Sequence, residues 1–144
     1  MRRFLCGVLF AVVACGGGDS TEPEPAFPDV AGNYNMTGRF DGLTEAEGRM
    51  NGTLTLTQAS RNSGALGGNL ALTAQLGGDV LSGNRLLEQA SVSPAGQLSF
   101  RVQSATDGIS WTFTANRSGN SFTGGRHTIT DGATTLSGSW EASR

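Results

Sequence analysis

From residue 29 onward, apolar and polar side chains alternate in short runs, and most runs end in a cluster of turn residues. A strand places successive side chains on opposite faces, so this period of two predicts strands that are buried on one side. The pair Asp131-Gly132 is a strong hairpin signal, because both residues tolerate the positive φ angles of a tight turn. We predict eight strands, at residues 32–40, 50–58, 66–76, 80–93, 97–103, 109–115, 121–130 and 134–143.

The connections between these strands are short, so each strand should pair with the next in antiparallel, up-and-down order. Eight such strands can close into a barrel, which removes the exposed edges of an open sheet. Glycines recur at about one per strand on the apolar face, where they would let a strand coil sharply. We therefore predict an all-β fold, a small antiparallel up-and-down eight-stranded β-barrel. The least regular strand should be 80–93, because Leu86-Leu87 breaks the alternation and a bulge near Gly83-Asn84 would fit it.

The two ends of this region carry a resemblance to known barrels. It opens with Val30-Ala31-Gly32-Asn33-Tyr34 and closes with Ser137-Gly138-Ser139-Trp140. Aromatic residues and glycine recur in the strands between, and the pattern resembles the calycin-type barrels, lipocalin-like and avidin-like. The lipocalin opening prefers tryptophan where Tyr34 stands, and the later loop signatures of that family are absent. The resemblance implies the fold and no particular ligand.

The amino-terminal residues predict an anchor. Two arginines precede an apolar run at residues 4–13, which is too short for a transmembrane helix of roughly 20 residues. Such a segment is typical of a secretory signal peptide. The aliphatic and small residues that end with Ala14, directly before Cys15, resemble the lipobox of bacterial lipoproteins. This resemblance implies cleavage after Ala14 and acylation of Cys15.

Several acyl chains on Cys15 would hold the mature chain stably at a membrane. The alternative is an ordinary secreted protein that is cut after Ala14 and keeps Cys15 as a free thiol. Cys6 lies inside the apolar run and should leave with the signal, so the acylated domain would contain no disulfide. Gly16 follows the cysteine, and the sorting rule of enterobacterial lipoproteins then implies the outer membrane. The expected location is therefore the bacterial cell envelope, with the barrel facing the periplasm or the surface.

A spacer joins the anchor to the barrel. Residues 16–28 carry three of the four prolines and three carboxylates, with almost nothing to bury, so they should stay extended. The predicted organisation is a lipoprotein signal peptide at residues 1–14, the lipidated cysteine and a disordered linker at 15–28, and the β-barrel domain at 29–144.

Charge and composition exclude several kinds of function. The formal net charge is −2, and loss of the two arginines with the signal makes it more negative, which disfavours nucleic acid as a partner. His127 is the only histidine, so a histidine-rich metal site is excluded, and no serine lies in a nucleophile elbow. We expect His127 at the surface or rim of the barrel. The sequence therefore predicts no catalytic residue, no metal site and no cofactor.

Aromatic side chains on the predicted apolar faces are the candidate barrel-interior or ligand-lining residues. They are Tyr34, Phe40, Phe100, Trp111, Phe113, Phe122 and Trp140. They could form the wall of a ligand cavity or a packed core, and an eight-stranded interior is just wide enough for either. We favour a packed core, because a domain without a disulfide depends on burial. In the last strand we expect Leu136 and Trp140 to be buried, with Trp140 near Tyr34 and above Gly138.

These observations predict a membrane-anchored, non-enzymatic lipoprotein whose lipocalin-like β-barrel acts as a binding or structural module of the cell envelope. Its partners would be the membrane, through the lipid on Cys15, and a small hydrophobic ligand or an envelope protein. Two alternatives stay open. One is a carrier of a small hydrophobic ligand inside the barrel. The other resembles the bacterial metalloprotease inhibitors, small eight-stranded barrels whose mobile amino-terminal segment plugs a protease.

Overall fold

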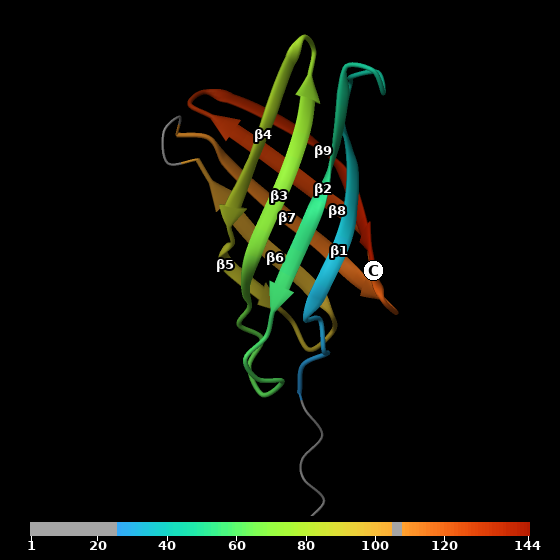
Figure 1. The fold of residues 1–144 in the computed structure, drawn as a ribbon, viewed down its shortest axis with the longest axis vertical. Coiled ribbons are helices and arrows are strands. Elements are labelled where there is room, and N and C mark those ends of the chain that lie inside the picture. Colours follow the sequence, from blue (N-terminus) through green and yellow to red (C-terminus); the bar gives the residue numbers. More distant parts are fainter. Residues whose placement is uncertain (1–25, 105–107) are drawn as a thin grey trace, which may run out of the picture.

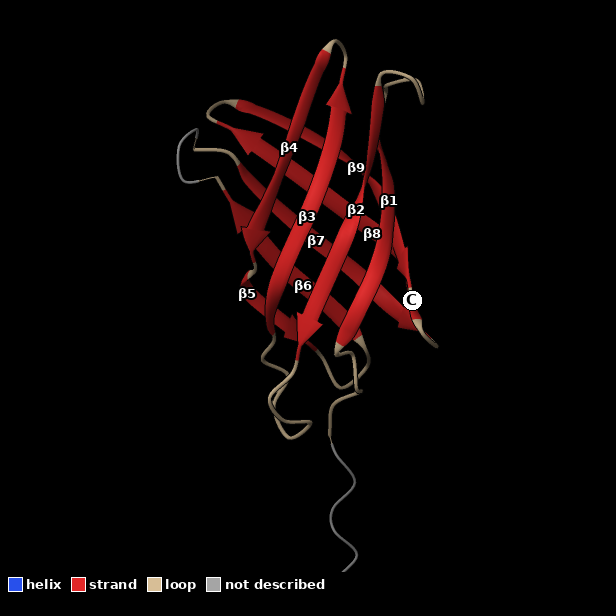
Figure 2. Ribbon diagram, viewed as in Figure 1, coloured by secondary structure: helices blue, strands red, loops and turns tan. Residues whose placement is uncertain are grey.

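The computed structural model describes residues 26–104 and 108–144. Every regular element within these ranges is a β-strand (Figure 2), and none of the described residues forms a helix that could span a membrane. The strands are β1 (Gly32–Phe40), β2 (Gly48–Thr57), β3 (Gly67–Leu76), β4 (Asp79–Leu86), β5 (Glu88–Val92), β6 (Gln97–Gln103), β7 (Ser110–Ser118), β8 (Ser121–Asp131) and β9 (Thr134–Ser143). The predicted signal peptide, the lipidation site Cys15 and most of the linker lie outside the described residues.

The strands form one antiparallel sheet in the order β4-β3-β2-β1-β9-β8-β7-β6-β5. Neighbours along the chain pair with one another everywhere except between β4 and β5, and β1 also pairs with β9. Figure 1 shows the sheet curled, with β1 to β4 in front and the remaining strands crossing behind them. The predicted all-β, antiparallel up-and-down architecture is confirmed.

The strand count differs from the prediction because the expected strand at residues 80–93 is divided in two. β4 pairs with β3 as far as Leu86, whereas β5 pairs with β6 from Glu88 onward. The division therefore falls at Leu87, beside the break in the alternation. No bulge occurs near Gly83-Asn84, because both residues pair regularly with β3. The sheet has nine strands where eight were expected.

This change of pairing partner has different effects at the two ends of the barrel. The barrel is closed at one end, whereas one side stays open at the other end. Near the end where the described chain begins, Ala65 forms an isolated bridge with Ser91 of β5. Leu66 and Val92 flank this bridge, and their N–H groups donate backbone hydrogen bonds of 2.9 and 2.8 Å to residues across it. Toward the opposite end, no strand pairing joins β4 to β6 within the described residues. We call this unpaired region the β4–β6 opening.

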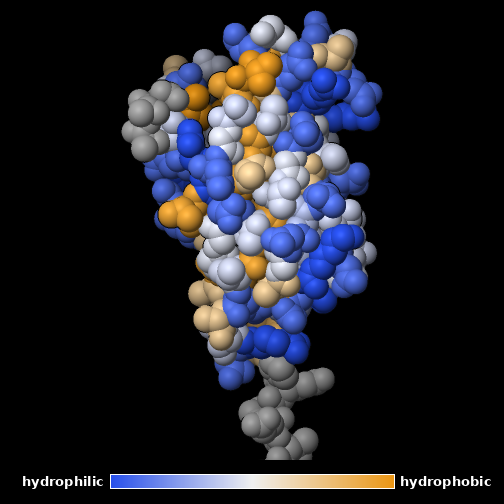
Figure 3. Space-filling view, viewed as in Figure 1, coloured by the Kyte–Doolittle hydropathy of each residue, from blue (hydrophilic) through white to orange (hydrophobic). Residues whose placement is uncertain are grey.

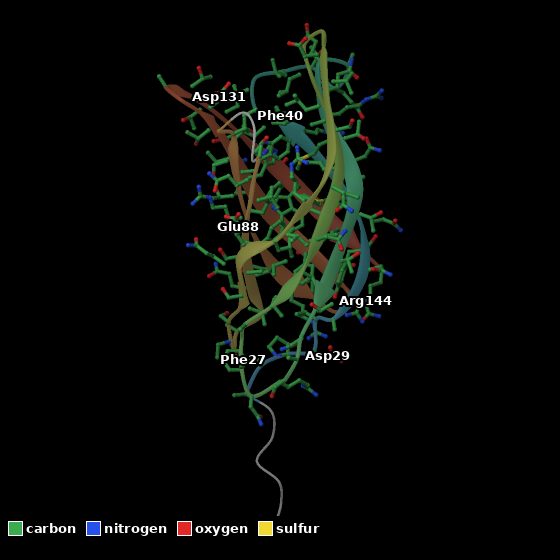
Figure 4. The ribbon with its side chains drawn as sticks, turned by 60° about the vertical axis from the view of Figure 1, so that its left-hand side comes forward. Phe27, Asp29, Phe40, Glu88, Asp131 and Arg144 are labelled. Atoms are coloured by element: carbon green, nitrogen blue, oxygen red, sulfur yellow. The ribbon has the colours of Figure 1, made fainter. Side chains whose placement is uncertain are left out.

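Side chains fill the space between the two layers (Figure 4). Every strand except β4 contributes buried apolar side chains to one continuous core. β4 contributes none, and its Val80 and Leu86 are 64% and 78% exposed. The interior of the barrel is therefore packed, and the poorly buried strand is the one that borders the opening.

Trp140 of β9 lies in the middle of this core. Its ring meets those of Phe100 and Phe113 edge-on, with ring centroids 5.9 and 5.8 Å apart. Its indole N–H donates to the backbone carbonyls of Thr114 and Arg126, both at 3.0 Å. A buried indole N–H needs such an acceptor, and here two neighbouring strands supply it.

Two expectations about β9 were wrong. Tyr34 is not near Trp140 but packs against Phe122, with ring centroids 5.0 Å apart. Leu136 is 36% exposed rather than buried. The space beneath Trp140 is provided by Gly125 of β8, where an added Cβ would lie 2.7 Å from the indole nitrogen.

We expect Trp140→Ala to lower the free energy of unfolding by roughly 3–5 kcal/mol, as removal of a large buried aromatic side chain does. Leu136→Ala, on the same strand but exposed, is the matched control and should change it by about 0.5 kcal/mol or less. Urea unfolding of both variants measures the difference. Similar effects for the two would show that Trp140 does not hold the core together.

Candidate functional site

The β4–β6 opening contains a cavity of about 130 Å³, which we call the β4–β6 slot. Its apolar lining comes from two sides of the barrel: Leu70, Leu72 and Leu81 on β3 and β4, and Val102, Ile109 and Trp111 on or next to β6 and β7. Leu70 is almost fully buried and Trp111 is 7% exposed, whereas Leu81 is 37% exposed at the mouth. The slot is thus an apolar recess that is open to solvent at one side.

The sequence of β4 explains why the slot forms there. Leu70 of β3 lies opposite Arg85 of β4, and Ala74 lies opposite Leu81, so the odd-numbered residues of β4 face the barrel interior. That face includes Arg85, while Val80 and Leu86 point outward. Because its apolar residues are divided between its two faces, β4 cannot bury one face as its neighbours do. Figure 3 shows hydrophobic patches on the surface that carries β3 and β4.

The structure places all seven predicted aromatic side chains in the interior, at exposures of 0–7%. It separates them into two groups. Tyr34 and Phe122 form a pair near the end where the chain begins. The other five are joined by ring contacts with centroids 4.8–6.4 Å apart, and in Figure 4 the labelled Phe40 lies near the opposite end. Only Trp111 of the seven lines the slot.

Sequence reasoning missed the rest of the slot lining. The signal was present in the break of alternation at Leu86-Leu87, which marked the place where the chain changes its pairing partner. Nothing in the local pattern indicated that β4 and β6 would lie on either side of a recess. That arrangement depends on how far the curled sheet closes.

His127 corrects a prediction, because it is 1% exposed and not at the surface or rim. A bulge at Gly124, with φ +59°, shifts the register of β8 and turns the His127 side chain inward. Nε2 lies 3.0 Å from the carbonyl oxygen of Arg39, which assigns the proton to Nε2 and makes it the donor. An added Cβ on Gly138 would collide with this ring, so glycine is required there.

Burial gives His127 an unusual electrostatic setting. Its ring stands edge-on to Phe40, with centroids 4.8 Å apart, and its Nδ1 atom has no hydrogen-bond partner among the described residues. Desolvation lowers the pKa of His127 from its ordinary value of 6.5, and the hydrogen bond to the Arg39 carbonyl opposes this only in part. The histidine is therefore a neutral member of the core.

Two exposed carboxylates near the Phe40 end of the barrel, those of Asp41 and Glu47, have lowered pKa values. The hydrogen bond from Arg126 lowers the pKa of Asp41, and the hydrogen bonds from Thr44 lower the pKa of Glu47. Asp41 and Glu47 both lie in loops, and neither lines the slot. Among the described residues, no group of three or more His, Cys, Asp or Glu side chains is placed to hold a metal ion.

A second hollow, of about 880 Å³, lies on the outer face of β1, β2, β8 and β9. Its charged side chains are two arginines and two glutamates, and Arg39 and Glu45 already form an ion pair at 3.6 Å. Because these charges balance, the hollow offers little selectivity for a charged ligand. The β4–β6 slot is the better candidate site, because binding pockets are mostly apolar and concave.

No protein-family model matches this sequence, and a search of curated proteins finds no match. Among solved structures, the chain is similar to EF1p2_mFAP2b bound to DFHBI, with a TM-score of 0.54 and 12% sequence identity. The similarity covers 80% of this chain and 93% of that chain. At this identity it supports the β-barrel fold and does not transfer a function.

The buried histidine predicts a pH dependence of stability. Because the folded pKa lies below 6.5, the unfolded chain takes up a proton that the folded chain does not. Stability is therefore full above pH 6.5 and falls as the pH drops, by up to about 1.4 kcal/mol per pH unit. The variant His127→Gln keeps an N–H for the Arg39 carbonyl and does not titrate.

Urea unfolding between about pH 7 and pH 5 should show this loss in the natural chain and a flatter profile in His127→Gln. The carboxylates with lowered pKa values do not interfere, since their ordinary values are 3.8 and 4.5 and their effects lie at lower pH. Equal slopes for both proteins would contradict a neutral, buried His127.

Proposed function

We propose that this chain is a membrane-anchored, non-enzymatic binding module of the bacterial cell envelope, which takes a small apolar molecule in the β4–β6 slot. The observation that carries this proposal is the contrast between the packed barrel interior and the apolar recess at its open side. Aromatic rings fill the interior, so a ligand inside the barrel would have to displace core side chains. The slot needs no such displacement.

The size of the slot supports a compact ligand. An engineered apolar cavity of about 150 Å³ binds benzene, and this slot has a volume of about 130 Å³. Its floor is made of leucine, valine, isoleucine and tryptophan side chains, which favour an apolar ring or a short hydrocarbon. The similar barrel solved with DFHBI supports the view that this fold can carry a bound molecule.

Anchoring through Cys15 fits the position of the slot. The described chain begins at one end of the barrel, and the β3–β4 turn lies at the other end (Figure 1). A lipid on Cys15, followed by an extended linker, would tether the barrel by the end at which it is closed. The slot would then open away from the membrane, toward the periplasm or the cell exterior.

Filling the slot tests the binding site. In amide NMR spectra, benzene should shift the resonances of β4, β6 and the start of β7. Resonances from the end of the barrel where the described chain begins should not change. Leu72→Trp, which adds volume on the slot wall, should abolish these shifts. Thr73→Trp, exposed on the opposite face of the same strand, is the matched control and should retain them. Shifts that survive Leu72→Trp, or no localised shifts in the natural chain, would exclude the slot.

Lipid labelling tests the anchor. Radiolabelled palmitate should enter the natural chain and the Cys6→Ser variant, but not Cys15→Ser. Because attachment would rest on acyl chains, the Cys15→Ser protein should move to the soluble fraction. A Cys15→Ser protein that still sediments with membranes would show that the barrel itself has membrane affinity.

A further inference from the structure

Among the described residues that line the β4–β6 slot, Arg85 is the charged one. It lies on the inward face of β4, directly opposite Leu70 of β3, whose apolar side chain is buried. Gly83, two residues earlier on the same face, leaves room for the guanidinium to lie along the strand. An added Cβ on Gly83 would be 3.2 Å from Nη1 of Arg85. The cation is therefore positioned beside the slot.

The guanidinium of Arg85 has no acidic partner in the described part of the chain. Two salt bridges occur there, Arg39 with Glu45 and Arg126 with Asp41, and Arg85 takes part in neither. Its one hydrogen bond among these residues is a long contact of 3.4 Å from Nη1 to the carbonyl of the adjacent Asn84. A guanidinium carries five N–H donors in a planar fork, so most of its capacity is unused by these residues.

Among the described residues, the slot lining contains no aspartate or glutamate. Its polar members besides Arg85 are uncharged, including Ser82 and Gln103, while its floor is apolar. The described lining residues thus carry a net positive charge, in a chain whose overall formal charge is −2. A ligand that matches this surface has an apolar body for the floor and a negative group for the rim, since a planar carboxylate accepts two parallel hydrogen bonds from arginine.

We propose that the ligand of the slot is a small apolar carboxylate, with a body of about the size of a benzene ring in the recess and its carboxylate on Arg85. This inference rests on the proposed binding function and specifies its ligand class. Recognition divides between the two parts. The floor supplies burial of the ring, and Arg85 supplies the preference for an anion over a neutral molecule of the same shape.

The experiment compares benzoate with benzamide, which has nearly the same shape and no charge. Both are titrated by amide NMR into the full chain carrying Cys15→Ser. Benzoate should bind about fivefold more tightly than benzamide, the value expected for one partly exposed ion pair. This preference should shrink as salt is added. In Arg85→Gln it should disappear, while benzamide binds as before.

Arg117→Gln is the matched control, because it removes the same charge from an exposed arginine at the other end of β7. It should keep the preference for benzoate. If both probes bind equally in the natural chain, or if Arg85→Gln retains the preference, the carboxylate assignment is wrong although the slot still binds apolar molecules. If neither probe nor benzene binds, the proposed function itself fails.

Discussion

The bulge at Gly124-Gly125 is the constraint on which the interior of this barrel depends. Before the bulge, Phe122 of β8 points inward, and after it the buried positions are Gly125, His127 and Ile129. Without the extra residue, the alternation would carry Arg126 into the core instead. Burial of an unpaired guanidinium is far more costly than burial of a neutral imidazole. The bulge therefore decides which residues of β8 can form the core.

The same bulge links the core to the wall of the slot. It brings Gly125 beneath Trp140, whose indole N–H bonds carbonyls on β7 and β8. From Trp140, ring contacts run through Phe113 to Trp111, which forms part of the slot lining. That side of the slot is consequently backed by the packed centre of the barrel. The side formed by β4 has no buried residue behind it.

Most of the fold could be predicted from the sequence because strand periodicity and turn chemistry are local. The first, sixth and ninth strands have the predicted boundaries, at residues 32–40, 97–103 and 134–143. The position of His127 could not be predicted, since a pair of glycines signals a bulge but not the register that follows it. The slot was missed for a different reason. It lies between β4 and β6, which do not pair, and local patterns carry no information on how far a curled sheet closes.

Arg85 links the open side of the barrel to the chemistry that we propose for the slot. Closing β4 onto the end of β6 beyond Arg101, where β5 no longer pairs with it, would cover the unpaired backbone there, as a closed barrel does. It would also press the inward-facing Arg85 against the apolar lining near Val102 and Trp111 and remove its water, without an acidic partner among the described residues. The cost of desolvating an unpaired charge exceeds the gain from a few backbone hydrogen bonds. This cost disfavours closure of the two strands on each other.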